Sequence, residues 1–324
     1  MNSTTAAGRI DVHHHYVSRD YVKAIGAEAI AAQGSSRSAP DWTPEHSLKI
    51  MEHAGIRTTI LSLGAPGMDM GNETATVRLT HHCNEDQVRI IAKHPGRFGF
   101  FAALPLPYFD AARRQAIVAL DDMHADGVTI LTNYGGRYFG DPVYWPLLEV
   151  LNARSALAFI HPTSPWQFEG FRELSPSTLE FPFDTTRALA SVLYHGVPQR
   201  FPNIRFLWSH AGGAMPYMAG RTAVLAERNP GFLLRGPEKM LPALRNFHFD
   251  ITQSANRATL AALRETVPIE NILFGTDWPM AGIPQVDLTL RQLEEASLTP
   301  AERYAIYRGN ALRLIPRLAQ TEKQ

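Results

Sequence analysis

The sequence has 324 residues but a single cysteine, Cys83, and no excess of charge of either sign. One cysteine cannot close a disulfide within the chain, and such sparse use of cysteine is typical of a reducing compartment. Lysine plus arginine number 31, and so do aspartate plus glutamate, which gives a formal net charge of zero. A chain without cationic excess is a poor partner for nucleic-acid phosphates or for anionic membrane surfaces.

Long apolar segments are also missing. No run approaches the roughly 18 residues that a membrane-spanning helix needs, and the first residues lack the basic and then apolar order of a secretory signal. Apolar residues still make up 45% of the chain, which is enough to build a buried core. We therefore expect a cytoplasmic globular protein whose partners include neither nucleic acid nor membrane.

Eight short apolar segments alternate with longer amphipathic ones. Each is rich in Val, Ile or Phe, as expected for strands that are buried on both faces. The segments are 9–12, 58–62, 98–103, 128–131, 156–160, 204–209, 247–251 and 272–275. Strands that alternate with helices indicate an α/β fold with a parallel sheet. A (β/α)8 TIM barrel and an open doubly wound sheet both fit, but no Gly-x-Gly-x-x-Gly fingerprint follows the first strand, which disfavours a dinucleotide-binding form of the open sheet.

Helix signals fall between these strands. Residues 73–93 carry apolar side chains at helical spacing and end at His94-Pro95-Gly96, while residues 110–125 end before Gly127. Asp141-Pro142 and Thr299-Pro300 each supply a capping residue and a first-turn proline. The proline-rich segment 162–182 is expected to form a loop insertion over the C-terminal mouth of the barrel. We predict one domain that spans residues 1–324.

Histidine and aspartate side chains directly follow four of the predicted strands. They are His13, His15, His161, His210 and Asp277. Alternation along a strand places His13 and His15 on one face and His14 on the other. All C-terminal strand ends meet at the mouth of a barrel, so these side chains should converge there. Three histidines and an aspartate suit a divalent ion with one position left open, with His210 as a nearby base. Four unrelated polar strand ends are the alternative interpretation.

These strand ends carry a family resemblance. The motifs are Ile10-Asp-Val-His13-His-His15, Phe159-Ile-His161-Pro, Ser209-His-Ala-Gly-Gly213 and Phe274-Gly-Thr-Asp277-Trp-Pro279. From Ile10 to about Arg313 the sequence resembles the amidohydrolase superfamily. Within it, the sequence is similar to the branch that contains aminocarboxymuconate-semialdehyde decarboxylase and the aromatic-acid decarboxylases. Stretches such as 60–67, 97–102, 125–129 and 181–187 are most similar to the 6-methylsalicylate decarboxylases.

The resemblance implies a set of site residues. The family's metal ligands fall on His13, His15, His161 and Asp277, and its catalytic histidine falls on His210. The fourth predicted strand ends at Leu131-Thr132-Asn133, without the lysine of the two-metal members. The resemblance therefore implies one divalent ion, Zn²⁺ in the first place, with Mn²⁺ as the alternative.

The implied substrate-binding residues are arginines. In the semialdehyde decarboxylase, an arginine eleven residues after the sixth-strand histidine reaches the neighbouring subunit. Arg221 has that spacing here, which implies a homodimer, although a helix-surface charge would also explain it. The branch often has an arginine after a Trp-x-Pro-Glu turn, where this chain has Ser47. Arg187 is another candidate for the substrate carboxylate, unless it only pairs with Asp184.

Together these observations predict a metal-dependent, non-oxidative decarboxylase of a small aromatic acid that carries an ortho hydroxyl group. The ion would hold carboxylate and phenolate oxygens, Asp277 would protonate the ring carbon, and His210 would relay the proton. A hydrolase of a lactone or amide that uses a metal-activated water, with Asp277 as base, is the alternative. A third interpretation, a barrel that only binds ligands, would be favoured if the protein held no metal.

Overall fold

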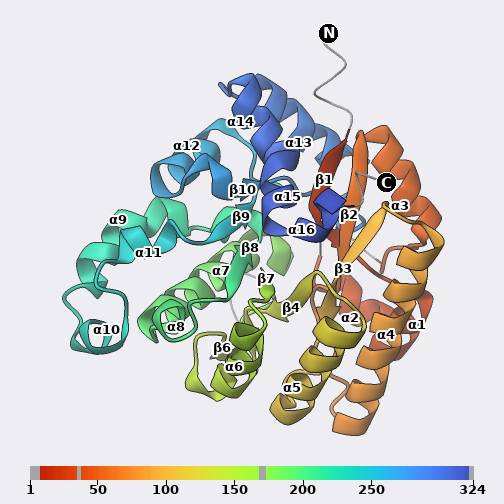
Figure 1. The fold of residues 1–324 in the computed structure, drawn as a ribbon, viewed down its shortest axis with the longest axis horizontal. Coiled ribbons are helices and arrows are strands. Elements are labelled where there is room, and N and C mark those ends of the chain that lie inside the picture. The colour runs from red at the N-terminus through yellow and green to blue at the C-terminus, as the bar shows by residue number, and fades with distance from the viewer. Residues whose placement is uncertain (1–7, 35–37, 168–172, 321–324) are drawn as a thin grey trace.

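A single parallel sheet organises the protein. The computed structural model describes residues 8–34, 38–167 and 173–320. Within these ranges, eight parallel strands form a sheet in the order β1-β2-β3-β4-β7-β8-β9-β10, and helices surround it (Figure 1). The strands are β1 (Arg9–His15), β2 (Ile56–Ser62), β3 (Phe98–Ala103), β4 (Gly127–Leu131), β7 (Leu157–His161), β8 (Arg205–Trp208), β9 (His248–Asp250) and β10 (Ile272–Leu273). All eight predicted strands are confirmed, and the fold is the predicted (β/α)8 TIM barrel.

The barrel closes between its first and last strands. A parallel bridge joins His14 to Trp278, just beyond β10. The backbone N–H of Asp277 donates to the carbonyl of His13 at 2.8 Å, and that of His15 donates to the carbonyl of Trp278 at 2.6 Å. The first-strand histidines and the aspartate that follows the last strand therefore lie side by side.

An apolar cluster fills the barrel interior. Its side chains come from the inward faces of the strands and from two C-terminal helices. They are Ile10, Val12, Ile60, Phe101, Leu157, Phe159, Leu207, Leu273, Ala311, Leu314, Ile315 and Leu318. Ala311 and Leu314 belong to α15 (Asn310–Leu314), Leu318 belongs to α16 (Pro316–Gln320), and Ile315 lies between them; these helices close the amino-terminal end of the barrel. The polar strand ends lie at the opposite end.

The helices agree closely with the sequence pattern. The segment predicted at 73–93 is α4, whose N-cap Asn72 accepts from the Ala75 N–H. The other helices outside the barrel are α1 (Arg19–Ile25), α2 (Ala27–Ala31), α3 (Pro44–His53), α5 (Phe109–Ile117), α6 (Trp145–Ala153), α7 (Pro176–Tyr194), α8 (Val197–Arg200), α9 (Met215–Ala226), α10 (Pro230–Arg235), α11 (Met240–Leu244), α12 (Arg257–Thr266), α13 (Ile283–Glu295) and α14 (Pro300–Tyr304). A short hairpin, β5 (Asn133–Tyr134) and β6 (Arg137–Tyr138), follows β4 and was not predicted.

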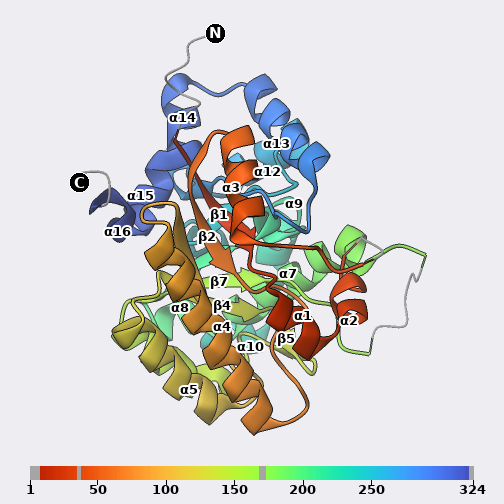
Figure 2. The same ribbon diagram turned by 90° about the vertical axis from the view of Figure 1, so that its right-hand side faces the viewer.

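The predicted loop 162–182 is partly helical, because residues 176–182 belong to helix α7. Residues 168–172 lie outside the described residues. Helix α7 already begins at Pro176, where proline costs no intrahelical hydrogen bond, and Pro182 lies inside the helix. Figure 2 shows α7 on the same side of the molecule as α1 and α2, and residues of all three regions line one cavity. No helix in the described part of the chain is long and apolar enough to cross a membrane.

Candidate metal centre and active site

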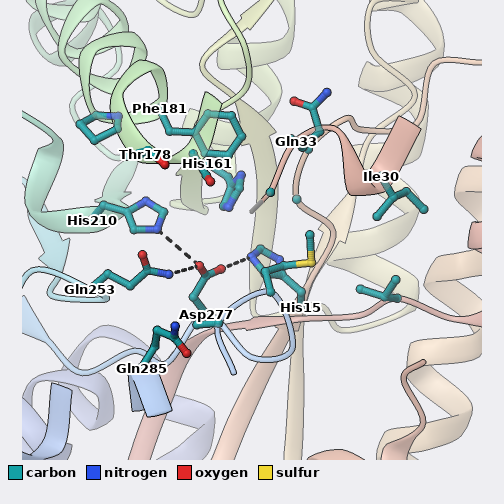
Figure 3. A pocket seen from close by; sticks show the side chains of 18 of the residues that line it. His15, Ile30, Gln33, His161, Thr178, Phe181, His210, Gln253, Asp277 and Gln285 are labelled. Atoms are coloured by element: carbon teal, nitrogen blue, oxygen red, sulfur yellow. Dashed lines mark hydrogen bonds and ion pairs between the residues drawn. The ribbon is translucent and has the colours of Figure 1, made fainter. Parts of the chain in front are cut away.

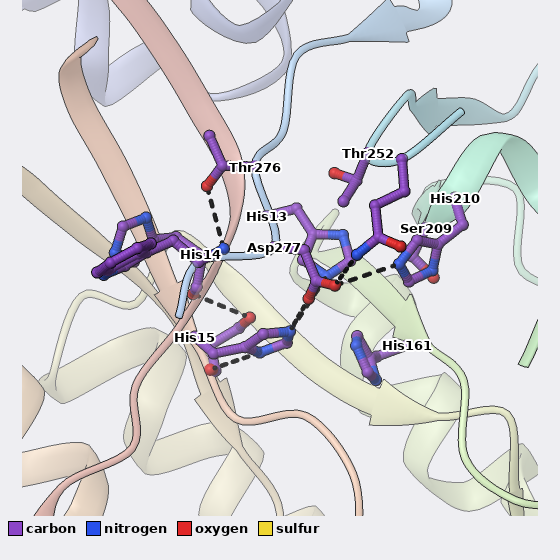
Figure 4. Close-up of polar contacts among 12 residues, drawn as sticks. His13, His14, His15, His161, Ser209, His210, Thr252, Thr276 and Asp277 are labelled. Carbon is purple, nitrogen blue, oxygen red and sulfur yellow. Dashed lines mark hydrogen bonds and ion pairs between the residues drawn. The ribbon is translucent and has the colours of Figure 1, made fainter. Parts of the chain in front are cut away.

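Strand β1 directs two histidines into the mouth because its pairing with β2 shifts in register. The shift lies between Asp11 and His14. Val12 faces the interior cluster, so strict alternation would turn His14 inward instead of its neighbours. An irregularity in a ladder re-aims the side chains that follow it. As a result, His13 and His15 both face the mouth (Figure 4).

His14 points away from the mouth, to the side opposite His13 and His15, as the sequence predicts for this triplet. Its Nδ1 lies 2.9 Å from the Asp11 carboxylate, and its Nε2 lies 2.8 Å from Ser47 Oγ. Ser47 also accepts from Trp42 Nε1 at 2.8 Å. Ser47 therefore packs behind β1 and does not stand in for the arginine that the family often places there.

The four predicted metal ligands come together at the mouth. One ligand atom from each of His13, His15, His161 and Asp277 lies within 4.8 Å of the others, and all four side chains are buried. Asp277 Oδ1 is 2.9 Å from His15 Nε2 and 3.4 Å from His13 Nε2. The Nε2 atoms of His13 and His15 are 3.2 Å apart. Two neutral imidazoles cannot direct lone pairs at each other over this distance, so a proton or a cation must lie between them.

The Nδ1 atom of each ligand imidazole has an acceptor. The acceptors are the Asp250 carboxylate for His13 (2.9 Å), the Ser62 carbonyl for His15 (3.3 Å) and the Pro162 carbonyl for His161 (2.8 Å). An acceptor holds the proton on Nδ1 and leaves the Nε2 lone pair available to a metal ion. Three imidazole nitrogens and one carboxylate oxygen fit a divalent ion such as Zn²⁺ or Mn²⁺.

The electrostatics of the site favour cation binding. Burial lowers the pKa of His161 well below its usual value, assisted by the neighbouring imidazoles, and burial also lowers the pKa of His15. Burial opposes ionisation of Asp277, but the adjacent imidazoles of His13, His15 and His210 hold its pKa well below the usual range. Burial likewise disfavours a charged His13, yet the carboxylates of Asp250 and Asp277 raise its pKa to about 10. Without a metal ion, the site therefore retains a proton on His13.

His210 stands beside the four-residue cluster. Its Nε2 is 3.9 Å from Asp277 Oδ2 (Figures 3 and 4). The turn that presents it has left-handed backbone at His210 (φ 50°) and at the glycines that follow. A side chain on Gly213 would place Cβ 2.0 Å from the Pro182 carbonyl oxygen, which explains the glycine there. The buried Nδ1 of His210 has no hydrogen-bond partner in the part of the chain that the structure describes.

Sequence reasoning missed two residues of this site, Asp250 and Gln253. Asp250 is fully buried; its Oδ2 contacts His13 Nδ1, and its Oδ1 accepts from the His210 backbone N–H at 3.1 Å. Gln253 Nε2 donates to Asp277 Oδ2 at 2.7 Å. Asp250 lies near the end of the seventh predicted strand, and Gln253 lies two residues beyond it. Their position at a C-terminal strand end could have identified them as candidate site residues.

A cavity of about 350 Å³ opens beside the cluster (Figure 3). The site residues on its wall are His15, His161, His210 and Asp277. Apolar walls come from Val17, Ile30, Ala65, Phe181 and Met280, and carboxamides come from Gln33, Gln253 and Gln285. Among the described residues, no lysine or arginine lines the cavity. Its volume is at the small end for ligand sites and suits a compact, mostly apolar ligand.

The two predicted arginines lie outside this cavity. Arg187, on α7, is exposed, and Asp184 accepts hydrogen bonds from Tyr138 (2.7 Å) and Asn133 (2.9 Å). Arg221, on α9, is also exposed. A single chain therefore brings neither arginine to the cavity, and their roles in substrate binding stay predictions.

The barrel and its mouth residues define the class of protein. The sequence pattern of the amidohydrolase family matches residues 10–317. The chain therefore belongs to the amidohydrolase family.

Known relatives narrow the similarity within the family. The 6-methylsalicylic acid decarboxylase of Aspergillus aculeatus is 34% identical over 97% of this chain and 98% of its own length. The 6-methylsalicylic acid decarboxylase of Penicillium expansum is 34% identical over 96% of this chain and 97% of its own length. A gamma-resorcylate decarboxylase of Rhizobium sp. is 29% identical over 82% of this chain and 85% of its own length.

Solved structures of other proteins share the fold of this chain. A crystal structure of an amidohydrolase II is 29% identical and aligns with a TM-score of 0.89 over 95% of this chain and all of the other. The dihydroxybenzoic acid decarboxylase of Polaromonas sp., which was crystallised with bound manganese and the inhibitor 2-nitroresorcinol, has a TM-score of 0.81. It is 22% identical and covers 96% of this chain and 97% of its own, so this likeness concerns the fold alone.

Proposed function

We propose that the protein is a metal-dependent, non-oxidative decarboxylase of a small aromatic acid with an ortho hydroxyl group. The observation that carries the proposal is the dual placement of Asp277, whose Oδ1 belongs to the metal cluster while its Oδ2 lies 3.9 Å from His210 at the cavity. Similarity to 6-methylsalicylic acid decarboxylases over nearly the whole chain supports this reaction class. The small cavity, in which apolar walls face polar site residues, supports a single-ring substrate with a polar substituent.

In this proposal His13, His15, His161 and Asp277 hold one divalent ion. When bound, the ion would supply Lewis acidity that neutralises and orients the oxygens of the substrate. Zn²⁺ is the first candidate because the ligands are mostly imidazole, and Mn²⁺ is the alternative.

The protein's own groups would handle the proton. Loss of carbon dioxide leaves an electron pair on the ring carbon, and that carbon must take up one proton. Asp277 Oδ2 is our candidate for the donor, because it is the carboxylate oxygen beside the cavity. Since Asp277 rests as a carboxylate, the proton must first reach it, and His210 is the adjacent imidazole that can pass it on. The net reaction exchanges carbon dioxide for that proton and uses no oxidant.

Hydrolysis of a lactone or amide is the second candidate. It would use the same residues, with Asp277 as base for a water molecule, and is favoured by the same position of Asp277 between cluster and cavity. The two reactions differ in product mass, because decarboxylation removes carbon dioxide and hydrolysis adds water.

We also propose that the enzyme works in the cytoplasm as a homodimer in which Arg221 reaches the partner's cavity. The apolar side chains Tyr217, Val224 and Leu225 are exposed on the same helix, α9, as Arg221. Exposed apolar surface of this kind is typical of an interface. Light scattering should give twice the chain mass, and a monomer would contradict the proposal.

The decisive experiment measures carbon dioxide release from salicylate-type acids with and without a chelator. We expect release from the untreated enzyme, loss of release after chelation, and recovery with Zn²⁺ or Mn²⁺. His210→Asn and Asp277→Asn should each lower kcat by roughly 10²–10⁴-fold. Activity that survives complete removal of the metal would rule out the mechanism, and a product heavier by one water would favour the hydrolase.

A further inference from the structure

Gln253 contacts Asp277 from the side away from the metal ligands. Its Nε2 donates to Asp277 Oδ2 at 2.7 Å, whereas Oδ1 lies 2.9 Å from His15 Nε2. An ionised carboxylate only accepts hydrogen bonds, so the amide nitrogen of Gln253 must be the atom that faces it. The two oxygens of Asp277 therefore have different partners: imidazoles for Oδ1 and an amide for Oδ2.

The backbone after β9 is shaped to present this amide. Gln253 has a φ of 53°, in the left-handed region that a residue with a Cβ seldom adopts. The turn is fixed by Asp250 Oδ1, which accepts from the Thr252 N–H at 3.0 Å, and by a 2.9 Å bond from the Ser254 N–H to the Ile251 carbonyl. Strained backbone persists where the surrounding structure enforces it, most often at functional sites. Here it turns Gln253 toward Asp277 (Figure 3).

We propose that Gln253 is a positioning residue that restricts Asp277 to a single ligand atom for the metal ion. The inference rests on the metal site of the proposed function. Carboxylates bind divalent ions through one oxygen or through both. Because the Gln253 amide occupies Oδ2, Asp277 offers Oδ1 alone. A coordination position that a second carboxylate oxygen would fill is thereby kept for an oxygen of the substrate.

The same contact keeps Oδ2 directed at the cavity. The imidazoles of His13 and His15 contact Asp277 at Oδ1 only. A contact at Oδ2 is therefore needed to prevent the carboxylate from rotating. His210 is 3.9 Å from Oδ2, beyond hydrogen-bond range. Gln253 is thus the group whose hydrogen bond sets the orientation of the proposed proton donor.

The test compares the native protein with Gln253→Leu, which removes the amide at similar size. Gln253→Asn is the second variant, because asparagine tolerates left-handed backbone but its amide is one methylene shorter. Gln199→Leu, at an exposed position of helix α8, is the matched control. Each protein is stripped of metal and titrated with Co²⁺, and the Co²⁺ form is then titrated with benzoate while its visible absorption is recorded.

We expect Co²⁺ to bind Gln253→Leu and Gln253→Asn within about threefold of the native Kd, but benzoate to bind them at least about tenfold more weakly. The absorption change on adding benzoate should shrink in both variants, since Asp277 would already occupy the position that benzoate takes. With an aromatic acid as substrate, KM should rise and kcat should fall. Gln199→Leu should match the native protein in every measurement.

Three results would overturn the proposal. The first is native benzoate binding in both Gln253 variants, and the second is loss of Co²⁺ affinity beyond about tenfold, which would mean that Gln253 only secures a ligand. The third is a native protein that does not bind Co²⁺, which would also remove the metal site itself. The cobalt measurements need no turnover, so a native protein that binds Co²⁺ and benzoate but releases no carbon dioxide would count against the proposed function alone.

Discussion

Asp250 links two parts of the site that are far apart in the sequence. One oxygen contacts the ring of His13 on the first strand, and the other holds the backbone of His210 after the sixth. Burial raises the free energy of its charged form, but the adjacent His13 outweighs this and lowers the pKa of Asp250. A single carboxylate thus orients the ring of a proposed metal ligand and also fixes the position of the proposed proton relay.

The raised pKa of His13 predicts that metal binding is coupled to proton release. Below about pH 10, the metal-free protein holds a proton on His13, which a metal ion must displace from Nε2. The lowered pKa values of His15 and His161 mean that these ligands are already neutral at pH 7. We expect about one proton released per ion near pH 7, with release vanishing above about pH 10.

Calorimetry in two buffers of different ionisation enthalpy measures this number directly. Apparent metal affinity should also rise by about tenfold per pH unit between about pH 7 and pH 9, because below its pKa His13 must lose one proton for each ion bound. Binding of the metal at neutral pH without release of a proton would show that His13 is neutral in the metal-free protein.

At the scale of elements, Gly64, just beyond β2, leaves room for the imidazole rings of His15 and His161. A Cβ on Gly64 would lie 2.8 Å from Cε1 of His15 and 3.1 Å from Cε1 of His161. Gly64→Ala should therefore displace both imidazoles and lower kcat/KM by about 100-fold, because small misplacements in a site are costly. The unfolding temperature should change little, since the added methyl group faces the mouth and not the core.

Steady-state kinetics and thermal unfolding of Gly64→Ala test this expectation. Gly282→Ala, at the start of α13, is a suitable control, because its Cβ would meet only Gln285 Oε1 at 3.4 Å and Pro284 Cδ at 3.6 Å. Kinetics of Gly64→Ala that equal those of the control would show that the mouth has more room than the structure indicates.

The strands were predictable because they are buried on both faces, and such segments are short, apolar and bounded by turns. The same logic located His161, which ends β7, and His210 and Asp277, which follow β8 and β10. The inward direction of His13 and His15 could not be derived from alternation alone. It depends on the register shift against β2, which is a property of two strands.

Other features depend on contacts between distant segments. The Gln253 amide meets Asp277 because β9 and β10 are neighbours and the turn after β9 is left-handed. Composition says nothing about either condition. The start of α7 was mistaken for a loop because its prolines read as breakers, although Pro176 occupies the first turn, where proline is tolerated.

At the scale of the whole molecule, the proposed metal ligands lie on both sides of the seam where β1 meets β10 and the barrel closes. His13 and His15 belong to β1, and Asp277 follows β10, where the two strands are joined by a bridge and a few backbone bonds. A bound ion should reinforce this closure. At a free metal concentration about 100 times Kd, binding stabilises the fold by about 2.7 kcal/mol. For a chain of this size, that corresponds to a rise in Tm on the order of 5 °C.

Calorimetric scans with and without Zn²⁺ or Mn²⁺ measure this rise. His161→Ala should reduce it, because β7 supplies the third imidazole. An equal Tm with and without a large excess of metal would show that the ion does not bind the native protein or binds the unfolded chain equally well.

The position of the ligands on both sides of this seam also determines when the site can form during synthesis of the chain. Its first ligand is residue 13 and its last is residue 277, so a ribosome must deliver most of the chain before all four can meet. A chain interrupted between residues 16 and 276 would carry His13 and His15 but would lack Asp277. The complete set of four ligands is therefore available only late in the synthesis of each molecule.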